Sequence, residues 1–417
     1  MKKIYYEIKL MQRSPLRIGA GETEETDSDI VLDRKGLPFV PGSSLAGVLR
    51  SLMDSEAVDK VFGDEKMENE SSIIISDATL VDEPLDSDIA ITIRDGIELD
   101  EWGVTVKGHK YDFQVVESKI PYRAVLELES DEVDYEELVD RLVNEVCIDG
   151  LSFGARTSRG YGRMDARAKK RVFEFPQNLD DWLEFDPFDK NSFTDCEEFD
   201  NATENISNTK VINVSFHVKD TFAIRVSTAR SERLDDGTIP DSVPLLNKEG
   251  KPVITGTSWA GSFRHHMNRL VREMQVDDES RNQCIKDINN YFGVMEGDEK
   301  KRSSIAFSET SIEGGKSEVV MRNAVDRFTQ ATRNGALFTS QVWKGGKGVL
   351  SITLGIDDSK INRYLAMTLM DMDMGLLSFG GEASIGRGLM EIDTIKVNGN
   401  DRTKQLKTHN DIYFLEG

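Results

Sequence analysis

Apolar and polar residues alternate near the start of the chain, and the same alternation returns about two hundred residues later. Residues Ile4 to Met11 and Val211 to Val218 both show this period of two, which predicts two β-strands, each half buried. Each predicted strand precedes a loop and then a stretch with apolar residues at helical spacing. The chain therefore begins the same order of elements twice.

The two stretches at helical spacing predict a helix in each half. Ser43 and Ser44 offer caps for the first helix, whose apolar positions are Leu45, Val48, Leu49 and Leu52. The second helix is predicted to begin near Thr257 or Ser258, and its apolar positions are Trp259, Phe263, Met267 and Leu270. We interpret both apolar stripes as core, because a stripe at this spacing needs no further function.

Comparison of the chain with itself indicates an internal duplication. Segment 27–50 aligns without a gap with segment 241–264, at an offset of 214 residues. Three more pairs follow in the same order: FGD at Phe62 with FGV at Phe292, SSIIISDATL at Ser71 with SSIAFSETSI at Ser303, and LSFGARTSRGYGRM at Leu151 with LSFGGEASIGRGLM at Leu377. Chance similarity does not keep four blocks collinear, so we infer that one unit occurs twice.

The duplication predicts two domains of the α+β class, over residues 1–175 and 209–395. Each domain reads as strand, loop, helix, two or more strands and a second helix before a glycine-rich loop. Between them, segment 176–208 holds ten acids and one lysine and lacks periodicity, so we predict an acidic linker there. Segment 396–417 is predicted to be a C-terminal tail.

Each half also contains a segment that predicts a long hairpin leaving the core. These segments run over 94–116 and 322–343, and both alternate polar and apolar residues with Gly, Asn or Thr interspersed and few large apolar side chains. Excursions of this kind usually serve an interface or a ligand.

The charge of the chain changes this picture little. The formal net charge of −23 argues against a generic nucleic-acid binder. However, segments 131–145 and 176–208 carry −15 of it, while arginines and lysines cluster between Arg156 and Arg171. No apolar run is long enough for a membrane span, and the first residues read as a strand and not as a signal peptide, so we expect a cytoplasmic protein.

Cysteine and histidine offer little chemistry. The three cysteines, Cys147, Cys196 and Cys284, lie too far apart in sequence for a CxxC metal site and do not form a disulfide framework. His265 and His266 are adjacent, and on a helix they would point to different faces. A zinc site is therefore not expected.

Two kinds of segment could bind an anion. Gly42, Ser43 and Ser44, and in the second half Gly256, Thr257 and Ser258, open the predicted helices, where free N–H groups and the helix dipole favour a phosphate. Many helices begin this way with nothing bound. Arg50 and Arg264 lie two turns further along and are more often surface or salt-bridging arginines.

The glycine-rich loops SFGARTSRGYGRM and SFGGEASIGRGLM are more specific. Glycine lets backbone lie close to a polyanion, and arginine can bind a phosphate with two hydrogen bonds. The alternative is a turn whose glycines supply positive φ angles. The candidates in these loops are Arg156, Arg159, Gly160, Gly162, Gly386, Arg387 and Gly388.

The order of these blocks resembles the repeat-associated mysterious proteins (RAMPs), and more narrowly two fused backbone subunits of type III CRISPR effector complexes. The most specific block is the helix start, which reads GLPFVPGSS in the first half and GKPVITGTS in the second. The resemblance covers the chain from Lys3 to about Asp393, without the linker and the tail. It implies a ferredoxin-like, RRM-like core in each unit, a palm that binds guide RNA, and a thumb hairpin that intrudes between guide and target.

The resemblance also implies an endoribonuclease site in each unit. In the family, an aspartate in the loop before the helix start cuts target RNA opposite each thumb, and this position corresponds to Asp27 and Asp241. Mg²⁺ and the other effector subunits are the implied cofactor and partners, and the metal ligands are unknown. Asp29 and Asp33 align with Val243 and Asn247, so we interpret them as solvated loop acids.

The two halves differ where the family pattern expects glycines and a base. The first loop of the first half carries Gly19 and Gly21 after Arg17, whereas the second half reads Arg225-Val226-Ser227. In the glycine-rich loop, Glu382 stands where the first half has Arg156. The two units are therefore expected to differ in how they bind RNA, in cleavage or in partner.

Three functions remain open from the sequence. The first is a subunit that holds guide RNA and cleaves complementary RNA at two sites, as part of antiviral defence. The second is a structural RNA-binding subunit whose aspartates do not cut. The third is a stand-alone endonuclease that processes guide RNA, which is disfavoured because we find no histidine matched between the halves.

Overall fold

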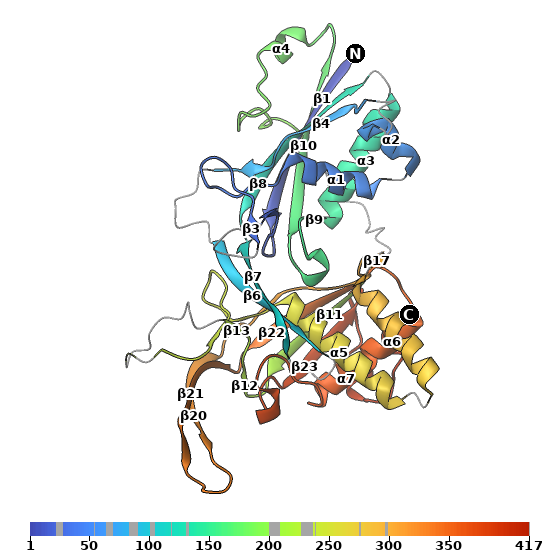
Figure 1. Ribbon diagram of the computed structural model, residues 1–417. Coiled ribbons are helices and arrows are strands. Elements are labelled where there is room, and N and C mark those ends of the chain that lie inside the picture. The colour runs from blue at the N-terminus through green and yellow to red at the C-terminus, as the bar shows by residue number, and fades with distance from the viewer. Residues whose placement is uncertain are drawn as a thin grey trace. The chain divides into compact units, whose positions relative to one another are not determined.

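The computed structural model describes residues 1–21, 28–53, 55–63, 70–82, 91–100, 105–117, 119–130, 133–199, 209–226, 237, 239–274, 277–296 and 299–416. The chain forms two compact units (Figure 1). The first unit comprises Met1–Ile93, Asp112–Thr157 and Tyr161–Ser207, and the second comprises Arg94–Tyr111, Ser158–Gly160 and Asn208–Gly417.

The first unit is built on an antiparallel sheet with the order β4-β8-β1-β10-β9, and β5 also pairs with β8. Its strands are β1 (Lys2–Gln12), β4 (Ile73–Ile75), β5 (Thr79–Leu80), β8 (Pro121–Ser130), β9 (Leu151–Ser152) and β10 (Arg163–Glu174). In the register of the central strand, Ile8 lies opposite Ala124 on one side and Ala168 on the other. The second, third, first and fourth core strands thus lie side by side, which is the ferredoxin-like order and confirms the predicted fold class.

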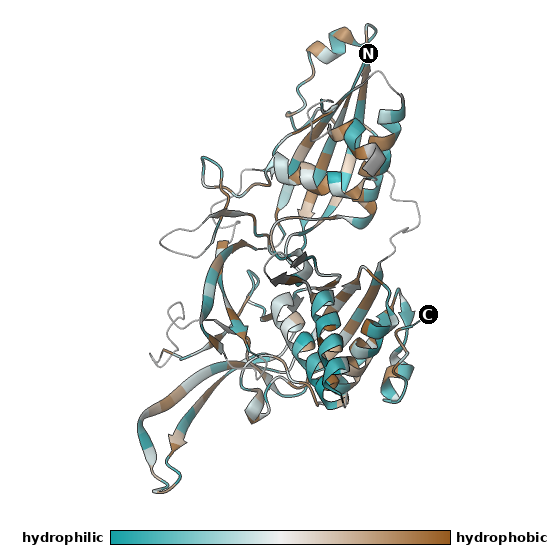
Figure 2. Cartoon of the chain, turned by 45° about the vertical axis from the view of Figure 1, so that its right-hand side comes forward, coloured by the Kyte–Doolittle hydropathy of each residue, from teal (hydrophilic) through white to brown (hydrophobic). Residues whose placement is uncertain are grey.

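Helices cover one face of this sheet, as Figure 1 shows. They are α1 (Gly42–Leu52), α2 (Ser55–Phe62) and α3 (Val133–Asp149). Hydrophobic and hydrophilic residues alternate along the strands beneath them (Figure 2). Leu45 and Leu49 of α1 and Val143 of α3 are buried against Ile8 in one core, because burying the apolar face is what holds a helix on a sheet.

The second unit repeats this topology. Its sheet has the order β18-β22-β11-β23-β24, formed by β11 (Lys210–Val218), β18 (Ile305–Phe307), β22 (Lys347–Leu354), β23 (Met390–Val397) and β24 (Asn400–Asp401), and its long helices are α5 (Gly256–Met274), α6 (Asp278–Phe292) and α7 (Ser359–Asp373). Trp259, Phe263 and Met267 are fully buried, which confirms the core stripe. Its last predicted member, Leu270, is only half-buried, and Val271 is buried in its place.

Both predicted hairpins are present. Strand β6 (Ile91–Leu99) pairs with β7 (Thr105–Val116), and β20 (Lys316–Val325) pairs with β21 (Thr332–Lys344). Each follows the second core strand and precedes the third. The β20–β21 hairpin extends away from the sheet of its own unit (Figure 1), and β12 (Thr221–Phe222) pairs with its base.

Short ribbons connect these elements. The pairs are β2 (Gly19–Gly21) with β3 (Asp29–Ile30), β13 (Arg225–Val226) with β14 (Val243–Pro244), β15 (Val253–Ile254) with β19 (Thr310–Ser311), and β16 (Val294–Glu296) with β17 (Glu299–Lys301). Single 3-10 turns lie in the two glycine-rich loops, at Thr157–Arg159 and Ala383–Ile385. Among the described residues, no helix combines the length and apolarity that a membrane crossing requires.

The segments predicted as linker and tail are more ordered than the sequence suggests. Residues 176–199 of the predicted linker, which we call the strap, include α4 (Leu179–Leu183) and pack on the first unit's sheet, where Phe193 is buried. In the predicted tail, α8 (Thr403–Lys407) contributes Leu406 to the second unit's core, and Phe414 joins it. Neither segment is a simple connector, because each buries apolar side chains.

Candidate functional site

Asp241 lies against the base of the β20–β21 hairpin. Its backbone N–H donates to the carbonyl of Thr339 on β21 at 2.7 Å, and its Oδ2 accepts from the N–H of the same residue at 2.7 Å. The next residue continues this contact, since the carbonyl of Ser242 accepts from the N–H of Gln341. Asp241 is exposed while Thr339 is buried. The carboxylate is therefore held at a fixed place where the hairpin leaves the core.

The matching aspartate of the first half, Asp27, lies outside the described residues, which resume at Ser28. The ribbon that follows it is present in both halves, as β2–β3 in the first and β13–β14 in the second. Gly19 and Gly21 are exposed on β2. The second half forms the same kind of ribbon without those glycines.

The start of α1 is already occupied by an acid of the chain. The N–H of Gly42 donates to Oδ1 of Asp77 at 2.7 Å. A Cβ at Gly42 would lie 2.7 Å from the carbonyl oxygen of Ile75, so glycine is required here by packing. Ser43 is exposed and Ser44 is half-buried. Asp77 thus accepts from an N–H group that the sequence predicted as a phosphate contact.

The start of α5 is capped in a different way. Oγ1 of Thr255 lies 2.8 Å from Oγ1 of Thr257 and 2.9 Å from Oγ of Ser258, and it accepts from the N–H of Ser258. A Cβ at Gly256 would meet the carbonyl oxygen of Phe307 at 2.4 Å. The hydroxyls of this turn therefore cap the helix itself.

The two helix arginines have partners on neighbouring helices. Arg50 lies 3.4 Å from Asp59 in an exposed ion pair, and Nε of Arg264 donates to Asn289 at 2.8 Å. These contacts agree with the interpretation of both as surface or salt-bridging residues.

The glycine-rich loops require glycine for steric reasons in both halves. Gly162 and Gly388 have φ angles of 72° and 78°, and a Cβ at either would lie within about 2 Å of a carbonyl oxygen, that of Phe153 or Phe379. Gly160 and Gly386 also have positive φ. The turn interpretation therefore accounts for these glycines by itself, whether or not RNA approaches them.

Substitution of these glycines should separate steric contact from backbone strain. We expect Gly386→Ala to lower the free energy of unfolding by about 1 kcal/mol, because only the positive φ is unfavourable there. Gly388→Ala should lower it by several times more, because the carbonyl of Phe379 must move. Urea unfolding of both variants measures the difference, and equal losses would contradict the close approach of Gly388 to Phe379.

Basic side chains of the first unit meet an aromatic ring near its glycine-rich loop. The guanidinium groups of Arg17 and Arg156 lie 4.5 and 4.8 Å from the ring centroid of Phe113, and Tyr161 packs edge-on against the same ring. Arg159 belongs to the second unit, which includes residues 158–160. There its Nη2 donates to the carbonyl of Phe292, the last residue of α6, at 2.9 Å.

In the second unit, the position that matches Arg156 carries an acid, Glu382, whose charge is neutralised by arginines. Glu382 is nearly buried and forms ion pairs with both Arg322 of the hairpin and Arg387 of the loop. Nη1 of Arg387 also donates to Thr221 at 3.2 Å. Arg387, a predicted phosphate contact, is itself buried. One internal acid of the loop thus neutralises two arginines, one from the hairpin and one from the loop.

Cys147 and the adjacent histidines lie in different environments. Cys147 is buried, and this burial raises the pKa of its thiol to about 11, which disfavours the thiolate. His266 is buried with Nε2 2.6 Å from Oδ2 of Asp371, whereas its neighbour His265 is exposed. The two imidazoles therefore face apart, as the sequence predicted.

The RAMP superfamily matches residues 10–165 and 216–391 of the chain. The chain belongs to the RAMP superfamily. Each matched region runs from the first to the fourth core strand of one ferredoxin-like sheet, so this RAMP protein holds two RAMP domains in tandem. That result confirms the duplication and the family resemblance.

Other comparisons are more distant. No curated protein matches the chain. A solved structure described as "Cryo-EM structure of the Type III-B Cmr-beta bound to cognate target RNA" contains a chain with 19% sequence identity. The match covers 42% of this chain and 61% of that chain, with a TM-score of 0.34. The RAMP protein thus spans less than two thirds of the length of that chain.

Some of these contacts could not be read from the sequence. The sequence marks neither Asp77 nor Thr339 as a contact residue; Asp77 lies in a duplicated block and aligns with Glu309. The alignment does not predict the contact with Gly42, because Glu309 pairs with Arg94 and Thr255 caps the start of α5. Thr339 gave no signal, because its contact with Asp241 uses only the backbone N–H and carbonyl.

Proposed function

We propose that this RAMP protein is a two-unit backbone subunit of a type III CRISPR ribonucleoprotein, and that it holds guide RNA and cleaves complementary target RNA at two sites. The observation that carries the proposal is the repeated placement of a long hairpin between the second and third core strands of a RAMP domain. Two such hairpins in one chain suit a subunit that contacts a guide–target duplex twice.

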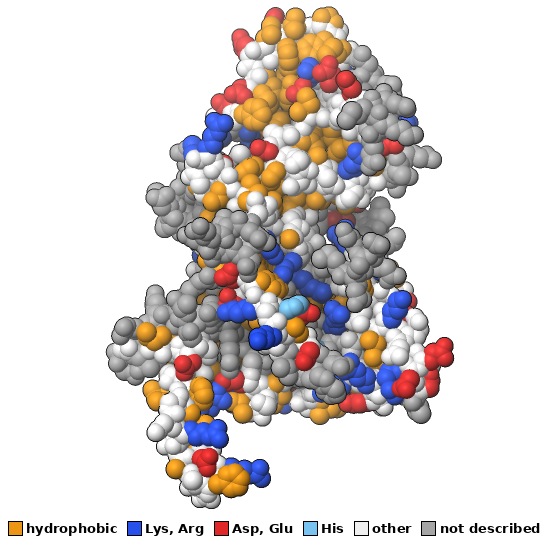
Figure 3. Space-filling view, in the orientation of Figure 1, with side chains coloured by type: hydrophobic (Ala, Val, Ile, Leu, Met, Phe, Trp, Pro, Cys, Tyr) orange, Lys and Arg blue, Asp and Glu red, His pale blue; other side chains and the backbone are white. Residues whose placement is uncertain are grey.

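The tip of the β20–β21 hairpin supports contact with a nucleic acid. Phe328 is 93% exposed, and Asp326 fixes the turn by accepting from the N–H groups of Phe328 and Thr329. Arg327 precedes the ring. Figure 3 shows basic and hydrophobic side chains together along this arm. An exposed ring beside a cation suits stacking on a base and contact with a phosphate.

The exposed carboxylate of Asp241 supports the cleavage step. In that step the 2′-oxygen of the target forms a bond to the adjacent phosphorus, and the bond from phosphorus to the 5′-oxygen breaks. Asp241 orients the 2′-hydroxyl or receives its proton, and the leaving 5′-oxygen takes a proton from water. Asp27 is proposed to do the same in the first unit.

A magnesium ion would fit beside such a carboxylate. Mg²⁺ is commonly held by one or two carboxylates together with substrate phosphates and water, and Asp241 offers one exposed carboxylate. The described residues contain no group of three or more His, Cys, Asp or Glu that could hold an ion alone. When bound, the ion would stabilise charge on the phosphate oxygens.

A non-catalytic role has one specific observation in its favour. One oxygen of Asp241 already accepts from the N–H of Thr339, so the aspartate stabilises the base of the hairpin whether or not it cuts RNA. A stand-alone guide-processing nuclease has no such support.

Bound RNA provides the first test of the proposal. We expect the chain, co-expressed with the other subunits of its effector complex, to purify with RNA of uniform length that carries a repeat-derived end. Sequencing of that RNA and mapping of the cuts in a complementary target should show two positions. Purification of the complete complex without RNA would rule out the proposal, and RNA without cuts would favour the structural role.

Removal of the internal acid should strengthen RNA binding by the second unit. We expect Glu382→Gln to raise affinity for guide RNA and to steepen its salt dependence, because Arg322 and Arg387 lose their counter-charge. Glu313→Gln, which removes an exposed acid paired with Lys251, serves as control. Filter binding at several salt concentrations measures the effect, and equal slopes for the two variants would argue against it.

A further inference from the structure

The face of the first unit's sheet opposite its helices carries aromatic rings and several cations, beside the acids Glu7 and Glu127. Tyr5 of β1 and Phe173 of β10 lie on it with ring centroids 6.0 Å apart. Lys169 and Arg171 of β10 project on the same side as Phe173, since the three occupy alternate positions of one strand. Arg123 of β8 lies across the sheet from Lys9. Rings flanked by cations on adjacent strands are the chemistry with which sheets bind single-stranded RNA.

The strap covers this face with its own rings. Phe185 lies 5.0 Å from the ring centroid of Tyr5 and 4.9 Å from that of Phe173, and Phe193 packs edge-on against Phe185. Trp182 donates from Nε1 to the hydroxyl of Tyr5 at 3.1 Å. The strap rings therefore occupy the positions where stacked bases would lie.

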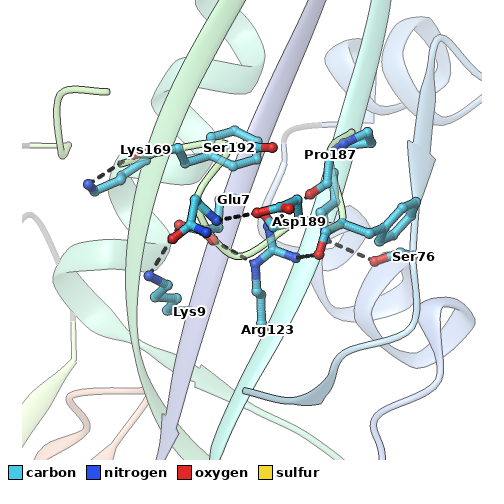
Figure 4. Close-up of polar contacts among 12 residues, drawn as sticks. Glu7, Lys9, Ser76, Arg123, Lys169, Pro187, Asp189 and Ser192 are labelled. Carbon is cyan, nitrogen blue, oxygen red and sulfur yellow. Dashed lines mark hydrogen bonds and ion pairs between the residues drawn. The ribbon is translucent and has the colours of Figure 1, made fainter. Parts of the chain in front are cut away.

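The strap also satisfies the cations of the face, as Figure 4 shows. Arg123 donates to the carbonyls of Pro187, Phe188 and Asp189, at 2.8, 3.1 and 3.2 Å. Lys169 donates to the carbonyls of Phe193 and Thr194, and Arg171 donates to that of Ser192. Carbonyl oxygens of the strap thus take the places that phosphate oxygens of a nucleic acid would take.

The strap is held to the sheet by side chains and has little regular backbone pairing with it. Its bridge to the sheet edge is Lys169 with Glu198, and α4 is one short turn of helix. The net charge of the strap is negative and repels RNA, since residues 176–199 hold eight acids and one lysine.

The second unit has polar Asn213, Ser215 and His217 at the matching positions of β11, where they are half-buried. The aromatic face and its cover therefore occur together in the first unit.

We propose that the strap conceals a single-stranded RNA-binding face on the first unit, and that RNA binds Tyr5, Phe173, Lys169 and Arg171 when the strap is displaced. This face is distinct from the loops and hairpins of the proposed function. The strap acts as an internal competitor that keeps the face closed until a longer or higher-affinity strand displaces it.

The test compares closed and opened forms of the full chain. A release variant, Phe185→Ser/Phe193→Ser, removes the rings that hold the strap, and a control, Leu183→Ser/Phe188→Ser, removes two exposed apolar residues of the same segment. Hydrogen exchange of strap peptides reports opening. Fluorescence anisotropy with a labelled ten-nucleotide polyuridine reports binding, and size exclusion checks that the protein stays dispersed.

We expect the release variant to bind polyuridine at least about tenfold more tightly than the wild type, which corresponds to the contribution of one stacked base. Adding Lys169→Gln and Arg171→Gln should abolish this gain, and the control should show none. If the release variant misfolds, replacing residues 179–196 by a Gly/Ser linker of equal length removes the strap directly, with the same expected gain.

Two results would overturn the proposal: an opened strap with unchanged affinity, or a gain that persists after the two face cations are removed. Guide binding and target cleavage by the wild type are separate readouts, so loss of the proposed function would leave the difference between closed and opened forms unaffected.

Discussion

Asp241→Asn should abolish target cleavage at one of the two positions while leaving the fold intact. Asparagine keeps an oxygen that accepts from the N–H of Thr339, so the contact at the hairpin base is preserved. It removes the negative charge that orients the 2′-hydroxyl or takes its proton, and loss of such a group slows a reaction by about 10² to 10⁴-fold. Target RNA cut by the assembled complex and separated on a sequencing gel measures the loss at each position.

Two further substitutions complete this experiment. Asp27→Asn should remove the other cut, and Asp29→Asn should remove neither, because the second half has Val243 at that position. Guide RNA content should be equal in all variants. If Asp241→Asn cleaves normally while Asp241→Ala destabilises the protein, the aspartate is structural and the non-catalytic function is correct.

Arg123→Met should cause the largest loss of stability in the first unit. Glu7 is only 2% exposed, and its carboxylate accepts from Nε of Arg123 at 2.6 Å. Without the guanidinium, a buried charge remains with Lys9, which is 3.4 Å away and half exposed, as its main ion-pair partner. Breaking one side of a buried pair costs about 3 to 5 kcal/mol, and the strap also loses three hydrogen bonds to Arg123.

The matched control is Lys9→Met, which removes the exposed partner of the same carboxylate and should cost about 1 kcal/mol or less. The double variant Glu7→Leu/Arg123→Met should recover much of the loss, because an apolar pair of similar size needs no desolvation of charge. Urea dependence of hydrogen exchange in β1 peptides measures the first unit separately. A loss for Arg123→Met no larger than that for Lys9→Met would refute the buried-pair account.

The fold was predictable because the two halves of the chain can be aligned with each other. Alternation identified β1 and β11 within two residues of their observed ends, and the spacing of Trp259, Phe263 and Met267 identified α5. Duplication then assigned the glycine-rich loops and hairpins to equivalent places. The sequence did not reveal the strap, because Trp182, Phe185 and Phe193 are spaced irregularly among acids and fit no periodic pattern.

The candidate site was less predictable than the fold. Alignment of the halves located Asp241, and the structure adds the contact that holds it. Gly42 was predicted as a phosphate contact, but whether its N–H is available depends on Asp77, 35 residues further along the chain. The substitution of Glu382 for Arg156 was visible in the sequence. Its pairing with Arg322 and Arg387 was not, because it depends on how the hairpin and the loop meet in space.

The backbone at Arg156 and Glu382 has a consequence for how such a chain evolves. Both residues have φ near 64°, a left-handed conformation that few residues other than glycine adopt. The two copies of the loop share this conformation while one carries a base and the other an acid. Charge at this position can therefore be inherited and selected separately in each half, without any change in the path of the chain.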